Sequence, residues 1–196
     1  MLLNASFISE IDEEINKTAQ MLREGKIIVY PTDTIWGIGC TVSSVNSVLR
    51  IRDIKKRSDD KYFILLVSDI AMLKQYTMTI HPRIENLLSI HERPLTIIYP
   101  LAQNVSELLL PKNKSIGIRI CKDLFCQALI QQTGEALIAT SANISGFPSP
   151  SHFGEITNEI LQSVDYVCQY KRMDKSPQSP SVMANYNEDG ELNFIR

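Results

Sequence analysis

Residues 27–39 have the sequence IIVYPTDTIWGIG, and this stretch decides the fold. The apolar run 27–30 predicts a buried strand, and residues 31–39 predict a turn at its end. The turn carries two hydroxyl groups, a carboxylate, an aromatic ring and two glycines, and glycines allow a ligand to approach the backbone. Open α/β sheets bind small molecules at such strand ends, so the turn is a candidate site. A plain turn followed by a helix cap is the alternative.

The remaining chain alternates predicted strands with predicted helices. Strands are predicted at 27–30, 63–67, 95–99, 116–120, 136–139, 164–168, 182–186 and 192–195, and helices at 10–24, from a cap at Ser43 or Ser44 to about Lys56, and at 70–76, 82–90, 123–132 and 152–163. The alternation indicates an α/β fold, but it is not strict enough for a purely parallel sheet. We therefore expect a mixed, twisted sheet. Because no low-complexity linker divides the chain, we expect a single domain over residues 1–196.

Composition excludes several classes of protein. The 196 residues are 44% hydrophobic and 21% charged, which argues against disorder. The formal net charge of −2 predicts weak or transient RNA contact at most, because proteins that hold nucleic acid tightly are usually basic. The four cysteines form no C-x-x-C pair, so buried thiols are expected rather than a zinc site. Without a signal peptide or an apolar run of roughly 20 residues, the sequence predicts a cytoplasmic protein with no membrane contact.

A basic run follows the second predicted helix. Lys55, Arg57 and Lys61 lie within seven residues. Cations near a helix C-terminus are favoured by the helix dipole, and this alone could explain Lys55. The alternative is an anion site, in which the Arg57 guanidinium grips two phosphate oxygens and the lysines add point charges.

Two further features carry polar groups in apolar surroundings. Residues 140–143 (Thr-Ser-Ala-Asn) come at the end of a predicted strand, where they could cradle a phosphate or carboxylate, or form an ordinary Asx or ST turn. Arg119 lies inside an apolar strand and must find a partner, because burying its charge unpaired is costly. That partner is either a structural carboxylate or the carboxylate of a substrate.

Four segments, in this order and at these separations, resemble the YrdC family. They are residues 31–39, the run Lys55–Lys61, the strand segment Ile118-Arg119-Ile120, and residues 141–146 (SANISG). The family patterns are P-T-[DE]-T-x-[YW]-G-[LI]-G, K-x-R-x-x-x-K, x-R-x within a strand, and S-x-N-x-S-G. The chain departs from the usual family pattern at Tyr62, Arg93 and Val182. It also lacks the extra C-terminal domain of longer members, so it resembles the short, stand-alone form.

The resemblance implies a YrdC-like fold: a twisted open mixed sheet with helices packed on it and a central concave basic cleft. It implies an L-threonylcarbamoyladenylate synthase, a nucleotidyltransferase that combines L-threonine, bicarbonate and ATP, with Mg²⁺ expected on the triphosphate. The products would be threonylcarbamoyl-AMP and pyrophosphate. Other proteins would then transfer the threonylcarbamoyl group to tRNA, giving threonylcarbamoyladenosine.

The family's site residues carry over by motif position. Thr34 and Arg119 would hold threonine, with Thr32 shaping the turn and Ser181 closing over the substrate. Lys55 and Arg57, as catalytic cations, would hold the phosphates together with Lys61. The residues that would contact ATP or its adenylate are Ser115, Ser141, Asn143, Ser149 and Arg196.

Two other functions are compatible with the same pattern. A YrdC-like RNA-binding or ribosome-associated module would retain the fold without adenylate-forming activity. A related carbamoyl-adenylate enzyme of hydrogenase maturation would be embedded in a much longer chain. The formal charge of −2 counts against the module, and the K-x-R and S-x-N segments favour the synthase.

Overall fold

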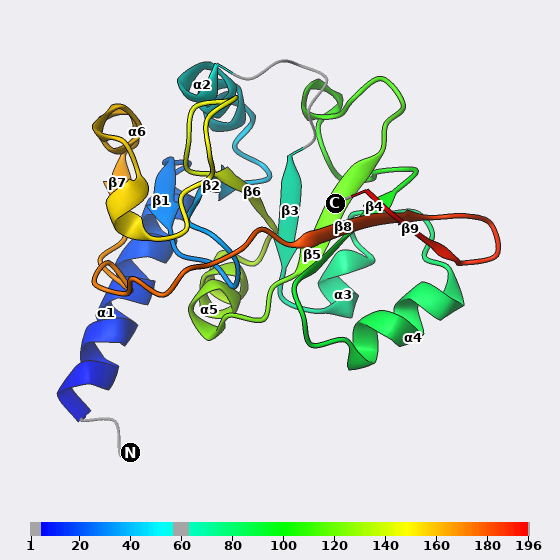
Figure 1. The fold of residues 1–196 in the computed structure, drawn as a ribbon, viewed down its shortest axis with the longest axis horizontal. Helices are drawn as coiled ribbons and strands as arrows, with labels where there is room; N and C mark the ends of the chain where they lie inside the picture. Colours follow the sequence, from blue (N-terminus) through cyan, green and yellow to red (C-terminus); the bar gives the residue numbers. More distant parts are fainter. Residues whose placement is uncertain (1–4, 57–62, 196) are drawn as a thin grey trace.

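One mixed β-sheet organises the chain. The strands are β1 (Ile28–Tyr30), β2 (Gly37–Thr41), β3 (Ile64–Val67), β4 (Leu95–Tyr99), β5 (Ile116–Ile120), β6 (Leu137–Ser141), β7 (Tyr166–Val167), β8 (Val182–Tyr186) and β9 (Leu192–Phe194). The computed structural model describes residues 5–56 and 63–195, and within them these nine strands have the order β7-β1-β2-β6-β3-β5-β4-β8-β9 (Figure 1). The pairs β1–β7, β3–β5 and β4–β8 are parallel, and the other neighbours are antiparallel. The prediction of a mixed α/β sheet is confirmed.

Helices cover both faces of this sheet. They are α1 (Ala5–Arg23), α2 (Val45–Lys55), α3 (Ile70–Leu73), α4 (Pro82–Ile90), α5 (Leu124–Thr133) and α6 (Asn158–Ser163), with 3₁₀ turns η1 (Glu107–Leu109) and η2 (Phe153–Glu155). Side chains alternate across a strand, so Leu65 joins one buried cluster and Leu66 the other. The Leu66 cluster includes apolar residues of α1 and α5, whereas α2, α3, α4 and α6 contribute to the Leu65 cluster.

The ends of α5 agree with the prediction. The Asp123 side chain accepts a hydrogen bond from the Cys126 N–H at 3.0 Å and so caps the first turn. Gly134 ends the helix in the left-handed conformation, with φ of 74°. Here local sequence signals were sufficient, because both caps depend on residues within one turn of the helix end.

Strand β2 was missed. Residues 31–36 form the predicted turn, but residues 37–39 begin a strand that pairs with both β1 and β6. Two glycines in a short segment weaken any strand pattern, since glycine has low strand propensity. At Gly39 the reason for glycine is contact, because a Cβ atom there would overlap the carbonyl oxygen of Ile138 on β6.

Three predicted helical features were wrong. The helix at 152–163 is divided into η2 and α6, because Ile156 and Thr157 between them have extended backbones. The helix expected at 70–76 ends at Leu73. Ser44 occupies the N-cap position of α2, but its hydroxyl does not cap the helix; it lies 2.8 Å from the Thr41 hydroxyl instead.

A long connection, residues 168–181, runs from β7 across the molecule to β8 near the other end of the sheet (Figure 1). We call it the crossing segment. Its Arg172 guanidinium donates hydrogen bonds to the carbonyl oxygens of Val167 and Cys168 and lies over the ring of Phe153. The Lys171 ammonium pairs with Asp123 at 2.7 Å. These contacts hold the segment to the end of β7, to η2 and to the start of α5.

Within residues 5–56 and 63–195, no helix is both long enough and apolar enough to cross a membrane.

Substitution of Gly39 tests the close approach of β2 and β6. We expect Gly39→Ala to lower the free energy of unfolding by about 3 kcal/mol, because the new methyl group overlaps backbone that cannot rotate away. Gly117→Ala in β5 is the control, since its Cβ would meet its nearest neighbour at 3.5 Å, an ordinary contact. The control should change stability by less than about 1 kcal/mol in urea denaturation. Equal losses in the two variants would contradict the argument.

The cysteines provide a second test. All four are free and buried, as predicted. Burial raises the pKa of the Cys40 thiol, and likewise that of Cys168, to about 12. Because the thiolate is the reactive form, iodoacetamide at pH 8 should leave these two thiols unmodified in the folded protein and alkylate both in urea. Mass spectrometry of peptides after each treatment measures this, and rapid native alkylation of either thiol would contradict it.

Candidate functional site

The loop between β1 and β2 is held by its own threonines. The Thr32 hydroxyl donates to the Ile35 carbonyl at 2.8 Å and accepts the Thr34 N–H at 3.1 Å. The two threonine hydroxyls lie 2.9 Å apart, and both residues are buried. These bonds of Thr32 hold the turn in place and fix the position of the Thr34 hydroxyl. Trp36 belongs to the core and packs against Phe153 with ring centroids 5.0 Å apart.

Arg119 has a carboxylate partner. Its Nη2 lies 3.0 Å from Oδ1 of Asp33, and both side chains are at least nine-tenths buried. The other Asp33 oxygen accepts the N–H of Lys122 at 3.0 Å. Of the two readings left open by the sequence, the structural ion pair is present. Nε of Arg119 is buried without a hydrogen bond among the described residues, so the pair does not use the whole guanidinium.

Lys55 is buried against the turn that follows β6. Its ammonium donates to the carbonyl oxygens of Ser141 and Asn143, the latter at 2.6 Å, and lies 3.3 Å from Oδ1 of Asn143. The Lys55 carbonyl in turn accepts the Ser145 N–H at 2.8 Å. The structure thus brings together Lys55, Ser141 and Asn143, which the sequence separates by more than 80 positions. Attraction to the helix dipole alone does not explain Lys55. That attraction would leave its ammonium in solvent, whereas the ammonium donates to two carbonyl oxygens.

The two groups of residues meet at one end of the sheet. Gly37 of β2 lies opposite Ser141 of β6, and the Ala142 N–H donates to the Trp36 carbonyl at 2.9 Å. The loop that carries Thr34 is therefore hydrogen-bonded to the turn that carries Ser141. Asp33 connects the same loop to Arg119 on β5.

The other predicted site residues lie at several separate places in the fold. Ser115 is buried just before β5 and donates to Oδ1 of Asn113 at 2.8 Å. Ser181 is buried beside β4, where its hydroxyl lies 2.8 Å from that of Thr96. Ser149 is exposed. Three predicted residues, Arg57, Lys61 and Arg196, lie outside the described residues, so the concave basic cleft stays a prediction.

The crossing segment adds residues that the sequence did not predict. A cavity of about 30 Å³ lies between the β1–β2 loop and this segment, and its lining includes Thr32, Thr34, Lys171, Ser176 and Gln178. This volume is close to that of one water molecule. No local signal marks these residues, because they reach the loop only through the long connection between β7 and β8.

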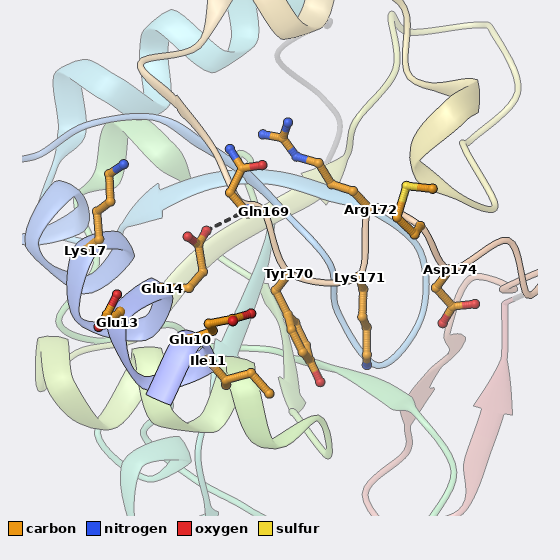
Figure 2. Close-up of a pocket in the computed structure, with 11 residues that line it drawn as sticks. Glu10, Ile11, Glu13, Glu14, Lys17, Gln169, Tyr170, Lys171, Arg172 and Asp174 are labelled. Atoms are coloured by element: carbon orange, nitrogen blue, oxygen red, sulfur yellow. Dashed lines mark hydrogen bonds between the residues drawn. The ribbon is translucent and has the colours of Figure 1, made fainter. Parts of the chain in front are cut away.

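A second cavity, of about 660 Å³, lies between the outward face of α1 and residues 169–174 (Figure 2). None of the predicted ligand-binding residues lines it. Glu14 on its wall accepts hydrogen bonds from the Tyr166 hydroxyl and from the Gln169 N–H, the latter drawn in Figure 2. These contacts fasten α1 to the start of the crossing segment.

Comparison with known proteins identifies the family. The model of the Sua5/YciO/YrdC family, described as "Telomere recombination", matches residues 20–196. The chain therefore belongs to this family, and the resemblance seen in its motifs is confirmed.

Two similar proteins have the same assigned name. The threonylcarbamoyl-AMP synthases of Shigella flexneri and of Escherichia coli O6:H1 are each 32% identical to the chain over 139 residues. The match covers 69% of this chain and 73% of each relative.

Solved structures show the same fold. E. coli YciO has a TM-score of 0.80 at 27% identity, covering 94% of this chain and 88% of that one. The P. abyssi Sua5 structure complexed with L-threonine also has a TM-score of 0.80, at 23% identity, covering 93% of this chain. At that identity the likeness concerns the fold alone, and this chain spans 53% of the Sua5 chain.

Paired lysine variants test the buried ammonium. We expect Lys55→Met to lower the free energy of unfolding by about 3 kcal/mol, because two carbonyl oxygens lose their charged donor in a buried place. Lys56→Met is the control, since the Lys56 ammonium pairs with Glu159 where both side chains are more than half exposed. Its loss should cost about 0.5 kcal/mol or less in the same denaturation experiment. A Lys55 variant as stable as the control would show that the turn does not depend on this ammonium.

Proposed function

We propose that this protein is an L-threonylcarbamoyladenylate synthase, which makes threonylcarbamoyl-AMP and pyrophosphate from L-threonine, bicarbonate and ATP. One structural observation carries the proposal: the Thr34 loop and the Ser141–Asn143 turn are hydrogen-bonded neighbours at one end of β2 and β6. The name of the curated relatives supports the same conclusion. A threonine group and an adenylate group must lie side by side if they are to be joined.

The reaction needs little general acid–base catalysis from the protein. The threonine amine and bicarbonate give N-carboxythreonine and water. The new carboxylate then attacks the α-phosphate, forming a P–O bond as pyrophosphate leaves with the electrons of the bond that breaks. Because the nucleophile is already anionic, catalysis rests on positioning and on neutralising charge. The described residues of the site offer cations, hydroxyls and an amide, which suits this requirement.

Each residue has a role in this proposal. Thr34 and Arg119 hold threonine, Thr32 holds the loop, and Ser181 closes over the substrate. Lys55 stabilises the turn that faces the nucleotide, and its buried charge favours the phosphates. Arg57 and Lys61 grip the phosphates. The groups that contact the nucleotide are Ser115, Ser141, Asn143, Ser149 and Arg196.

Mg²⁺ enters as part of the ATP substrate. Within the described ranges no cluster of three His, Cys, Asp or Glu side chains could hold a metal ion. The cations, hydroxyls and amide of the site suit phosphate groups, and the magnesium ion would be carried on the triphosphate, as is common for nucleotide-using enzymes. The protein's own residues then bind and orient the phosphates.

The product belongs to tRNA modification. Threonylcarbamoyl-AMP is a mixed anhydride and therefore an activated acyl donor, and in this proposal other proteins transfer its acyl group to tRNA to give threonylcarbamoyladenosine. We place the synthase in the cytoplasm as a single domain. With a net charge of −2, any direct contact with tRNA is weak.

Pyrophosphate release tests the proposal. The wild-type protein should release pyrophosphate only when threonine, bicarbonate and ATP are all present. Arg57→Ala should lower kcat by about 100-fold, because the transferring phosphate loses a cation. Ser141→Ala should raise the KM for ATP by about tenfold, through loss of a hydroxyl that bonds no other described residue. Ser89→Ala is the control, because among the described residues its exposed hydroxyl bonds only the Asn86 carbonyl within α4.

Absence of pyrophosphate release would distinguish the synthase from the alternative function. Wild-type protein that binds ATP but releases no pyrophosphate would overturn the synthase proposal. Salt-sensitive tRNA binding in that protein would favour the RNA-binding module.

A further inference from the structure

Asp33 has a structural role that the motif alone does not explain. It lies between Thr32 and Thr34, so solvent would be the ordinary surroundings of a loop carboxylate. Instead its side chain is 7% exposed, and its two oxygens have different partners. Oδ1 lies 3.0 Å from Nη2 of Arg119, and Oδ2 accepts the Lys122 N–H at 3.0 Å.

The first contact joins the guanidinium to the loop, and the second joins the loop to the backbone just after β5. Arg119 belongs to β5, and Lys122 follows the end of that strand. Asp33 thus joins the β1–β2 loop to β5 at a side chain and at a backbone group. The orientation of Arg119 and the position of the neighbouring Thr34 therefore depend on one carboxylate.

The remaining part of the guanidinium could receive an anion. A guanidinium has five N–H donors in a planar fork, and one edge can hold a carboxylate with two parallel hydrogen bonds. Nη2 forms the ion pair with Asp33 at 3.0 Å, but neither Oδ1 of Asp33 nor the buried Nε of Arg119 makes a hydrogen bond among the described residues. A buried donor without a partner is costly, and a bound carboxylate would remove that cost.

Charge and geometry give opposite expectations for Asp33. An anion beside Arg119 lowers the positive potential there, so by charge alone Asp33 would weaken the binding of a carboxylate. By geometry it strengthens binding, because it holds the fork in one orientation before the ligand arrives. The buried ion pair with Arg119, on a loop that the Lys122 N–H also holds in place, favours geometry.

We propose that Asp33 is the positioning residue of the threonine subsite, which holds Arg119 so that its unbonded Nε–H is directed to the threonine carboxylate. This inference rests on the proposed function. Asp33 acts through Arg119 and does not itself touch the substrate.

The sign of the effect on threonine affinity tests this proposal. Asp33→Asn keeps the size of the side chain but removes its charge. We expect the dissociation constant for L-threonine, measured by calorimetry, to rise about tenfold, and the KM for ATP to stay within twofold. Asp12→Asn, an exposed position on α1, is the matched control for loss of one charge and should change neither value. An unchanged or lower dissociation constant in Asp33→Asn would overturn the proposal.

A double-mutant cycle separates positioning from a general structural role. If Asp33 acts through Arg119, the Asp33→Asn change should cost no further threonine affinity in an Arg119→Lys background. Additive losses would contradict this. Asp33→Glu restores the charge and should recover at least part of the affinity. If Asp33→Asn does not fold, Asp33→Glu is the test by itself. An Asp33→Glu variant that folds like the wild type but does not bind threonine would then count against the proposal.

Failure of the two proposals can be told apart. Wild-type protein that neither binds threonine nor releases pyrophosphate would remove the proposed function and this inference with it. Wild-type activity combined with normal threonine affinity in Asp33→Asn would remove this inference alone.

Discussion

The close approach of β2 to β6 is the constraint on which the structure depends. β2 joins the β7–β1 part of the sheet to the part that contains β6, β3 and β5, so the order of the sheet requires both of its edges to be paired. Only glycine at position 39 permits this, because any Cβ atom would meet the backbone of Ile138. The same pairing places Gly37 opposite Ser141 and joins the Thr34 loop to the Ser141–Asn143 turn. A packing requirement of the fold therefore also assembles the site.

Two buried cations then stabilise the assembled segments. Lys55 donates to backbone carbonyls, so its charge is solvated by dipoles, whereas Arg119 is neutralised by the Asp33 carboxylate. A neutralised arginine offers direction more than charge for a single carboxylate. Removing either contact leaves a buried polar group without its partner, which is among the larger costs of single substitutions.

The crossing segment shows how residues without any local signal can lie beside the candidate site. Residues 168–181 run over the β1–β2 loop because β7 pairs with β1 at one edge while β8 pairs with β4 far across the sheet. Lys171 and Arg172 anchor the segment to Asp123 and to backbone carbonyls. The Ser/Pro-rich composition of residues 175–180 predicts only a loop, and nothing in it indicates which surface that loop covers.

By itself the sequence determined the family, most of the strands and a set of candidate site residues, because motifs, caps and apolar runs depend on neighbours within a few positions. Thr34, Arg119, Lys55 and Ser141 could all be named in this way. Only the tertiary structure decided that Asp33 is the partner of Arg119, that Lys55 is buried against carbonyl oxygens, and that residues 37–41 form a strand. Each of these depends on contacts between segments that lie tens of residues apart, and no local pattern specifies which distant segment will fill a given contact.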